Sequence, residues 1–297
     1  MEIYMFSDYL KDKFGEKLYK LKLTSGMTCP NRDGKCGNKG CIFCSEKGSG
    51  EFTADKNLSI DEQIEAQKKI VPTISGKYIA YFQNFSNTYD TPENIKKLYA
   101  PIVHRDDIAV LSVATRPDCI SDEIVEILSE LNKIKPVWVE LGLQTIHEST
   151  ANYIRRGYPL SVYTKTSTKL REAGINVITH LIIGLPNETK EDIIKSAEFV
   201  GRFSDGIKFH SLYISKGTDI ATDYEKGIFT LLTLDEYTDI LCECIRRIPK
   251  STVIHRLTAE TEKSSLIAPL WTSDKINVLR EIKNAFYDRN IIQGENI

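Results

Sequence analysis

The sequence predicts an α/β protein built on a parallel sheet, because short apolar stretches with strand character alternate with amphipathic stretches of helical period. Each connection between successive strands is long enough for a right-handed helical crossover. At 297 residues, with 41% hydrophobic and 27% charged residues, the chain has the composition of a globular protein with one large core. Polar residues follow the strands in turn, at the carboxyl ends where parallel sheets carry their sites.

The first strand is predicted where Tyr19, Leu21 and Leu23 alternate with lysines, directly before a loop rich in cysteine and glycine. Ser59 and Glu62 form a capping box that begins a helix. Strands are then predicted at 77–82, 108–114, 137–143, 177–183, 207–214 and 252–256. Helices are predicted at 59–70, from 91, from 121, and at 147–155, 161–173, 189–203, 233–247 and 273–289. Six strand–helix units precede the C-terminal elements, so a doubly wound sheet and a partial barrel both fit.

Four of the seven cysteines, Cys29, Cys36, Cys41 and Cys44, lie within residues 28–45. Thiols this dense pair as disulfides, bind a structural zinc ion or hold an iron–sulfur cluster. Three thiolates would leave one iron of a four-iron cluster open to a substrate, whereas zinc would use Cys36 as a fourth ligand and close the site. The spacing alone leaves the cluster and zinc as alternatives.

The overall composition excludes several classes of function. A formal net charge of −2 gives no general attraction to nucleic acid, so such binding needs a local basic patch. There is no run of eighteen apolar residues and no signal-peptide pattern at the N-terminus, which predicts a cytoplasmic protein without a membrane segment. Thiols stay reduced in that compartment, and this disfavours disulfides. The sequence has no phosphate-binding loop of the G-x-x-x-x-G-K-[ST] type and no G-x-S-x-G nucleophile elbow.

Several other residues have both a structural and a functional interpretation. Cys119, Cys242 and Cys244 have apolar neighbours and are predicted to be buried thiols. His180 fits a core histidine and a ligand contact equally well, and Arg156 fits both a helix-end charge and a ligand contact. The basic residues of the N-terminal strand and the cysteine loop fit either a solvated surface or a basic rim around a metal; they include Lys20, Lys22, Arg32, Lys35, Lys39 and Lys47.

Four stretches together resemble the radical S-adenosylmethionine (SAM) superfamily. They are Cys29-x11-Cys41-x-x-Cys44, Thr115-Arg-Pro-Asp118, Glu140-Leu-Gly-Leu-Gln144 with Arg156-Gly157, and His180-Leu-Ile-Ile-Gly-Leu-Pro186. The chain is most similar to the branch related to the elongator catalytic subunit. The T-C-P-N-R-D-G stretch and His255-Arg-Leu-Thr258 resemble the YtqA/YhcC-like group. The resemblance covers nearly the whole chain and implies a partial (β/α)6 barrel over residues 1–258 with a C-terminal helical extension over 259–297.

The resemblance also implies the cofactors and their contacts. Cys29, Cys41 and Cys44 would hold a [4Fe–4S] cluster with SAM on the open iron, leaving Cys36 outside. Reduction by a donor such as flavodoxin or ferredoxin would give a 5′-deoxyadenosyl radical that takes hydrogen from the substrate. Gln144 corresponds to a ribose contact and Arg156 to a carboxylate contact. The other predicted cofactor contacts are Gln83, where the family has Gly-Gly-Glu, Thr115, Glu140, and His180, where the family often has an acidic residue.

The elongator relatives act on the wobble uridine of tRNA, so the resemblance implies tRNA as a partner. The YtqA-like group is implicated in converting a 5-carboxymethylaminomethyl group on that base to 5-aminomethyl. Residues expected at the substrate are Lys35, Lys39, Lys216, His255 and Arg256. A radical SAM enzyme with a small-molecule substrate and a non-catalytic zinc-binding interaction protein are the alternatives.

Overall fold

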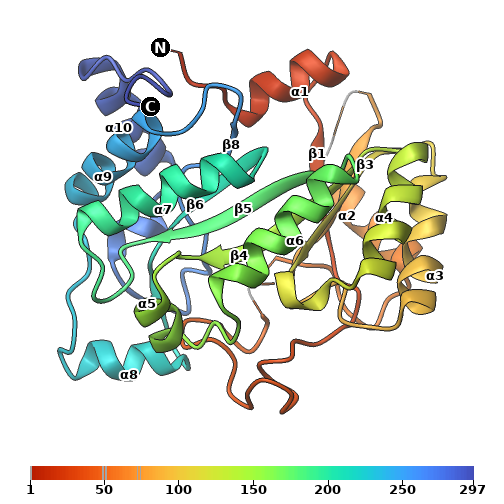
Figure 1. Cartoon of the computed structure of the whole chain (residues 1–297), viewed down its shortest axis with the longest axis horizontal. Coiled ribbons are helices and arrows are strands. Elements are labelled where there is room, and N and C mark those ends of the chain that lie inside the picture. The colour runs from red at the N-terminus through yellow and green to blue at the C-terminus, as the bar shows by residue number, and fades with distance from the viewer. Residues whose placement is uncertain (1, 49, 51, 72, 74) are drawn as a thin grey trace.

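Seven parallel strands form one curled sheet in a computed structural model that describes residues 2–48, 50, 52–71, 73 and 75–297 (Figure 1). In spatial order the strands are β1 (Tyr19–Leu23), β2 (Tyr78–Phe82), β3 (Ile108–Thr115), β4 (Val137–Gln144), β5 (Asn176–Ile183), β6 (Gly206–Ser211) and β8 (Val253–Arg256). Two short strands, β7 (Ile214–Ser215) and β9 (Leu266–Ala268), pair antiparallel outside this sheet. Because every pair of neighbouring strands in this sheet is parallel, all the strand carboxyl ends lie at one edge.

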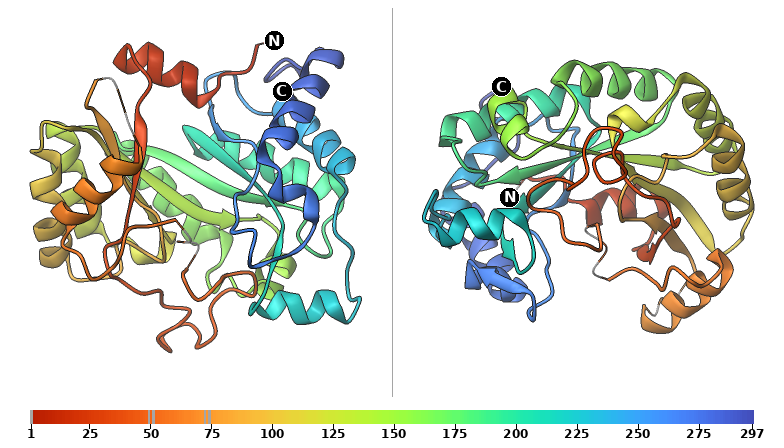
Figure 2. Two further views of the ribbon diagram at one scale, coloured as in Figure 1. Left: turned by 180° about the vertical axis from the view of Figure 1, so that it is seen from behind. Right: turned by 90° about the horizontal axis from the view of Figure 1, so that it is seen from below.

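Helices cover the convex face of the sheet, as the right-hand view of Figure 2 shows. They are α2 (Ile60–Ile70), α3 (Pro92–Val103), α4 (Asp122–Ile134), α6 (Leu160–Glu172), α7 (Lys190–Phe203) and α9 (Leu234–Arg246), with α10 (Lys275–Asp288) packed on α9. The shorter α5 (Glu148–Tyr153) and α8 (Asp219–Glu225) lie near the strand carboxyl ends. None of the helices in the described residues combines the length and apolar character needed to cross a membrane.

Side-chain caps fix where several helices begin. Ser59 and Glu62 form the predicted capping box of α2. At the start of α4, the side chain of Ser121 accepts a hydrogen bond from the backbone N–H of Ile124. Thr189 and Thr233 form equivalent boxes at α7 and α9. Each cap satisfies backbone donors that the first helical turn leaves unpaired.

Alternate residues of the strands divide between two cores, because successive side chains of a strand point to opposite faces. Outward-facing residues such as Leu111 and Val139 pack under the helices. At the amino-terminal ends, inward-facing residues such as Val110 and Trp138 pack with Leu10 of α1 (Phe6–Phe14). Helix α1 therefore closes one end of the half-barrel with an apolar floor.

Polar side chains replace apolar ones in the middle of the half-barrel. They come from the inward-facing positions above the floor and comprise Lys20, Tyr81, Ser112, Glu140, His180 and Lys208. On the same face of the sheet, two residues after Ser112 in β3 and Glu140 in β4, Ala114 and Gly142 line a pocket. These two residues have little or no side chain, so the barrel interior stays open toward the strand carboxyl ends.

The structure confirms the partial barrel and excludes the doubly wound alternative, because the strands follow one another across the sheet in chain order and the long helices α2, α3, α4, α6, α7 and α9 all lie on its convex side, while α1 closes one end. The sheet has a seventh strand, β8, which lies outside the six predicted units but extends the same sheet beside β6. The strand predicted at 207–214 ends at Ser211, and Ile214 begins β7 instead. Helix α1 was not predicted. Cys119, Cys242 and Cys244 are buried, as predicted.

Candidate active site

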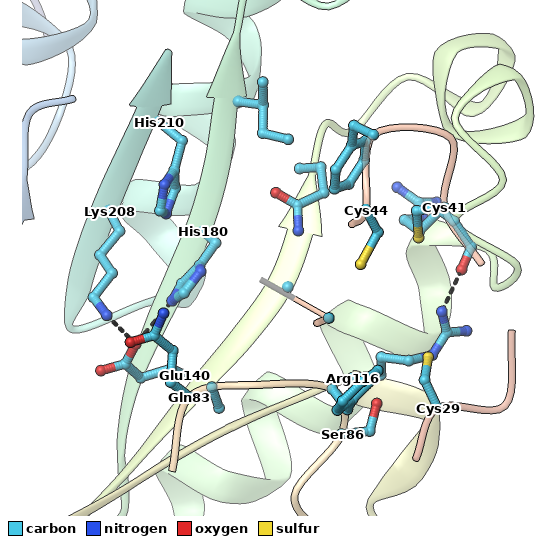
Figure 3. A pocket seen from close by; sticks show the side chains of 18 of the residues that line it. Cys29, Cys41, Cys44, Gln83, Ser86, Arg116, Glu140, His180, Lys208 and His210 are labelled. Carbon is cyan, nitrogen blue, oxygen red and sulfur yellow. Dashed lines mark hydrogen bonds and ion pairs between the residues drawn. The ribbon is translucent and has the colours of Figure 1, made fainter. Parts of the chain in front are cut away.

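A pocket opens at the strand carboxyl ends and extends into the half-barrel. One wall is the loop of residues 28–45, termed the cluster loop, which contributes Cys29, Cys41 and Cys44. The opposite wall includes Glu140 and Lys208 from the middle of β4 and β6. In Figure 3 the three thiols lie on one side of the pocket, and Glu140, His180, Lys208 and His210 lie on the other. The pocket therefore joins a sulfur-rich end to a charged inner end.

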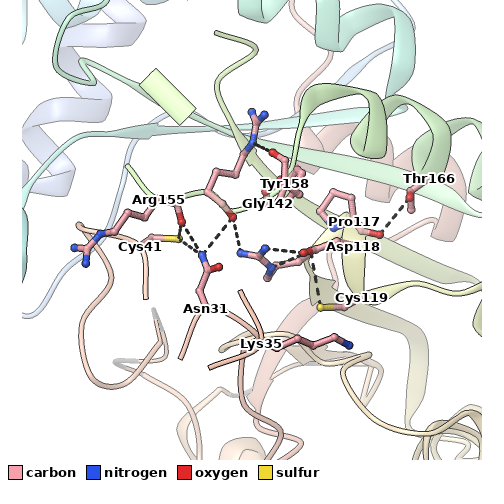
Figure 4. A network of polar contacts seen from close by, with 12 residues as sticks. Asn31, Lys35, Cys41, Pro117, Asp118, Cys119, Gly142, Arg155, Tyr158 and Thr166 are labelled. Carbon is pink, nitrogen blue, oxygen red and sulfur yellow. Dashed lines mark hydrogen bonds and ion pairs between the residues drawn. The ribbon is translucent and has the colours of Figure 1, made fainter. Parts of the chain in front are cut away.

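Asn31 fastens the cluster loop to the turn that follows α5. Its side-chain amide donates to the carbonyl oxygens of Arg155 at 2.7 Å and Arg156 at 3.3 Å, and its nitrogen lies 3.5 Å from Sγ of Cys41 (Figure 4). Gly157 provides the room for this contact, since a Cβ there would lie 2.5 Å from Oδ1 of Asn31. Its φ of +80° is also one that glycine adopts without cost.

The backbone of Ile42 adds two further attachments between the cysteines of the C-x-x-C pair. Its N–H donates to the carbonyl of Ile154 at 3.2 Å, and its carbonyl accepts from the N–H of Ile220 in α8 at 3.0 Å. The cluster loop is thus attached on both sides to α5 and α8, and this places Cys41 and Cys44 over the sheet edge.

Cys29, Cys41 and Cys44 line the pocket, whereas Cys36 is exposed and is absent from its walls. Burial and the neighbouring Cys44 raise the pKa of the Cys41 thiol to about 12, so a thiolate there needs a positive partner. Among the described residues, no three His, Cys, Asp or Glu side chains stand in ligating positions for one ion. Metal binding commonly draws such ligands together. Three pocket-facing thiols on one loop match the donor set of an iron–sulfur cluster, and their assignment as its ligands stays a prediction.

Arg116, part of the Thr115-Arg-Pro-Asp118 stretch but not among the predicted site residues, lies between the thiols in Figure 3. Its guanidinium donates to both carboxylate oxygens of Asp118, at 2.9 and 2.7 Å, and to the carbonyl of Arg156 at 2.7 Å. The fork-like bidentate pair fixes the guanidinium plane. A positive charge is therefore held rigidly beside the sulfur-rich end.

Arg156 is 2% exposed, and its guanidinium is already engaged by the protein. It donates to the carbonyls of Tyr158 at 2.9 Å and Thr145 at 2.6 Å, and to the Glu148 carboxylate at 3.2 Å. A guanidinium has five N–H groups, so donors remain after these bonds. The structure gives Arg156 a role in holding the turn at Gly157, and its predicted contact with SAM stays a prediction.

Gln144 ends β4 in a conformation that is unusual for a residue with a side chain. Its φ is +72°, and the register with β5 shifts between Gly142 and Gln144. Left-handed residues of this kind cost free energy and gather at functional sites, where a bulge re-aims a side chain. Gln83 and Thr115 also line the pocket. The structure brings these three predicted cofactor residues together, and their contacts with SAM stay predictions.

Glu140 is the centre of a group of polar and charged side chains inside the half-barrel, termed the Glu140 cluster (Lys20, Ser112, Glu140, His180 and Lys208). Oε1 accepts from Lys20 at 2.9 Å and Ser112 at 2.9 Å, and Oε2 accepts from His180 at 2.9 Å and from Lys208. Burial acts to raise the pKa of Glu140, but Lys20 and Lys208 outweigh it and hold the pKa well below its usual range. The carboxylate is ionised and fully engaged by the protein, so its predicted cofactor contact stays a prediction.

The Glu140 cluster corrects one interpretation of the sequence. The sequence predicts that Lys20 lies on a solvated surface or a basic rim, but its ammonium group lies inside the half-barrel against the ring of Tyr81. Sequence reasoning also missed Lys208 and His210, which face the pocket from β6. Their spacing of two residues within an apolar strand was a signal that both point to one face.

His180 and His210 bring two neutral imidazoles to the pocket. Burial and the charge of Lys208 lower the pKa of His180 to about 4, although the hydrogen bond that His180 donates to Glu140 acts to raise it. Burial, and then His180 and Arg256, lower the pKa of His210 well below its usual range. Nε2 of His210 is buried and has no hydrogen-bond partner among the described residues. It is therefore a polar atom available to a ligand.

The residues predicted to contact substrate fall into three places. Lys35 and Lys39 are exposed on the cluster loop, and Lys216 is exposed after β7, where its Nζ donates to the carbonyl of Ser264. Arg256 lines the pocket. His255 does not, because its ring stacks on Phe6 of α1 at 4.4 Å between centroids, at the closed end of the barrel. The structure therefore brings Arg256 to the site and takes His255 away from it.

A parallel half-barrel with a cysteine-bearing loop at its strand carboxyl ends defines a class of cofactor-dependent enzyme. The family model described as the Radical SAM superfamily matches residues 34–200, and that of the Radical_SAM C-terminal domain matches residues 204–288. The chain belongs to the radical SAM superfamily, whose enzymes use a [4Fe–4S] cluster and SAM. The family and cofactor predictions are confirmed.

Relatives and a solved structure agree with this assignment. The chain is 38% identical to YtqA of Bacillus subtilis, over 97% of this chain and 90% of YtqA. It is 35% identical to YhcC of Escherichia coli, over 98% of this chain and 94% of YhcC. It is 26% identical to a tRNA uridine(34) acetyltransferase of Methanocaldococcus jannaschii, over 53% of this chain and 29% of that protein. The structure of Elp3 from Methanocaldococcus infernus shares the fold, with a TM-score of 0.67 and 15% identity over 93% of this chain and 64% of that one.

Proposed function

We propose that this radical SAM enzyme modifies the wobble uridine of tRNA. The observation that carries the proposal is the sequence similarity to a tRNA uridine(34) acetyltransferase over 166 residues. Position 34 is the wobble position of the anticodon. The proposed reaction converts a 5-carboxymethylaminomethyl group on that uridine to 5-aminomethyl. Removal of two electrons from the carboxymethyl group and addition of water would release its two carbons as glyoxylate, and SAM, cleaved to methionine and 5′-deoxyadenosine, would be the two-electron oxidant.

The residues at the sulfur-rich end suit the cofactors of the family. In this proposal Cys29, Cys41 and Cys44 hold the cluster, and Gln144, Gln83 and Thr115 contact SAM at the strand ends. When bound, the cluster and SAM supply a 5′-deoxyadenosyl radical that abstracts hydrogen from the substrate. Electrons for this come from a small carrier such as flavodoxin or ferredoxin.

The protein's own task is to bring the base to the pocket and keep competing reactants out. A base that reacts in a pocket is normally turned out of its stack. The pocket reaches from the thiols to the Glu140 cluster, so an inserted uridine would direct its 5-substituent toward the barrel interior. Lys35 and Lys39, exposed on the cluster loop, are placed to meet phosphates that stay outside.

Nucleoside mass spectrometry of tRNA from a deletion strain tests the proposal. The expected result is accumulation of 5-carboxymethylaminomethyluridine and loss of nucleosides that derive from 5-aminomethyluridine. Wild-type chain should restore the pattern, a Cys44→Ser variant should not, and a Cys36→Ser variant serves as the matched control that should. Unchanged wobble nucleosides would contradict the proposal and favour a small-molecule substrate.

A further inference from the structure

The inner end of the pocket holds more positive than negative side chains. In the Glu140 cluster, one carboxylate faces two lysines, Lys20 and Lys208. Next to it, Arg256 of β8 is paired in register with Lys208 of β6 and also lines the pocket. The two neighbouring strands thus place two cationic groups side by side, away from the thiols.

A second carboxylate, Glu260, is shared among three cations. Its oxygens lie 3.4 Å from Nζ of Lys275, 3.8 Å from Nζ of Lys22 and 3.9 Å from Nη2 of Arg256. Within the described part of the chain this is the one ion pair of Arg256. One carboxylate cannot neutralise three cations, and a pair at 3.9 Å is longer than a hydrogen bond.

Five lysine and arginine side chains therefore share two carboxylates, and two of the five, Lys208 and Arg256, line the pocket itself. Like charges gathered in a partly desolvated space repel one another, so the arrangement is stabilised when an anion enters. The fork of an arginine guanidinium matches the two oxygens of a carboxylate. His210, whose buried Nε2 lacks a partner among the described residues, lines the same region and can add one hydrogen bond.

We propose that the inner end of the pocket is a carboxylate-binding subsite, in which Arg256 and His210 hold a carboxylate carried by the substrate. The inference rests on the proposed function and extends it, since the carboxymethyl group to be removed from the uridine ends in a carboxylate. The same subsite would reject a uridine whose 5-substituent lacks that charge. It thereby explains how the enzyme distinguishes its substrate from its 5-aminomethyl product.

Binding to the reconstituted holoenzyme with SAM tests the subsite. The probes are two anticodon stem-loop RNAs that differ only at the wobble substituent, one with 5-carboxymethylaminomethyluridine and one with the matching uncharged carboxamide. Wild-type enzyme should prefer the carboxylate by about tenfold to a hundredfold, the range expected for hydrogen bonds to a charged group. Arg256→Gln should abolish the preference, and Arg256→Lys, which keeps the charge but not the fork, should retain part of it.

Two further variants separate recognition from folding. Glu260→Gln removes the carboxylate that now pairs with Arg256, so it should increase the preference, a gain that damage to the fold would not produce. Arg280→Gln makes the same chemical change on an exposed arginine of α10 and should leave the preference unchanged. A preference that survives in Arg256→Gln, or that is absent from the wild type, overturns the subsite.

A second pair of probes keeps the subsite testable without RNA. N-benzylglycine and N-benzylglycinamide differ in the same charge, and their binding can be followed by NMR titration of the holoenzyme. If neither RNA binds but N-benzylglycine is preferred in an Arg256-dependent manner, the tRNA function fails and the subsite stands. If both RNAs bind equally well, the subsite fails and the tRNA function stands.

Discussion

At the residue scale, the chemistry of the half-barrel depends on ionisable side chains whose protonation states are set by burial and by neighbouring charges. Glu140 stays ionised because Lys20 and Lys208 offset the cost of burying its charge. His180 stays neutral because burial and Lys208 disfavour its cation. Removing one partner of a buried pair typically costs about 3–5 kcal/mol, since it leaves the other charge uncompensated. Replacing Glu140, Lys20 or Lys208 alone is therefore expected to destabilise the fold, because it leaves a buried charge without its partner.

The buried histidines predict a loss of stability in mild acid. The folded-state pKa of His180 is about 4, below the unfolded value, and that of His210 is also lowered. The unfolded chain thus binds protons that the folded chain does not, and stability present above about pH 6.5 is lost as the pH falls toward 4. His210→Gln should flatten the dependence of the unfolding free energy on pH, by at most about 1.4 kcal/mol per pH unit.

Urea unfolding between pH 7 and pH 5 measures this effect. His104→Gln, which changes an exposed histidine at the end of α3, serves as the control and should retain the wild-type slope. Equal slopes in His210→Gln and the wild type would show that His210 takes up its proton in the folded state.

The cysteines make a second prediction at this scale. Anaerobic reconstitution should give about four irons per chain and a broad absorbance at about 400 nm, the signature of a [4Fe–4S] cluster. Serine at Cys29, Cys41 or Cys44 should abolish both, because each replaces a pocket-facing thiolate. Cys36→Ser should retain both, because Cys36 is exposed outside the pocket. A colourless protein that binds zinc and requires Cys36 would refute the ligand assignment.

At the scale of elements, the N-terminal segment and the cluster loop shape the site from opposite ends. Helix α1 forms the floor through contacts of Leu10 with the inward-facing strand residues, and the cluster loop covers the mouth through Asn31 and Ile42. The pocket is the space left between them. Its depth therefore depends on how firmly each of these two segments is attached to the sheet.

Leu10→Ala tests the floor. Leu10 is 2% exposed, and deleting a buried leucine side chain of this kind costs about 2–5 kcal/mol because it removes contacts and leaves a cavity. Urea unfolding should show that loss, whereas Lys11→Ala, on the exposed side of the same helix, should change stability little. A loss below about 0.5 kcal/mol would mean that α1 is not part of the folded core.

Local signals made most elements predictable from the sequence. Capping residues such as Ser59 and Thr189 determine helix starts through contacts within four residues, so their pattern is readable without the fold. Helix α1 carried a signal as well, since Phe6, Leu10 and Phe14 repeat every four residues and Gly15 follows in a left-handed conformation. The break at Ser211 could not be read locally, because it depends on β7 pairing with β9, more than fifty residues away.

At the scale of the whole molecule, the part of the site that depends on residues close in sequence was predictable, and the part that depends on distant residues was not. The sulfur-rich end was predictable because its three cysteines are close in sequence. The charged inner end was not, because Lys20, Glu140 and Lys208 are brought together only when the sheet curls. The prediction that His255 contacts the substrate is not supported for a similar reason: the sequence does not show that Arg256 reaches the pocket while its neighbour His255 packs against α1.

The distribution of exposed charge leads to a prediction about the whole molecule and tRNA. Lys35 and Lys39 are exposed on the cluster loop, which forms one wall of the pocket, so in the proposed complex phosphates flanking an inserted base would lie against them. Each lysine–phosphate contact on a single strand changes the slope of log affinity against log salt by about 0.7. Replacing both lysines by alanine should therefore weaken binding of an anticodon stem-loop and reduce that slope by about 1.4.

Lys97→Ala with Lys133→Ala removes the same charge from α3 and α4 on the convex side, and serves as the matched control. It should leave the slope unchanged if RNA binds over the mouth. Cleavage of SAM without RNA should persist in both double variants, because neither touches the thiols or the strand ends. Equal slopes in the two variants would place the RNA elsewhere, since a general effect of net charge would act on both alike.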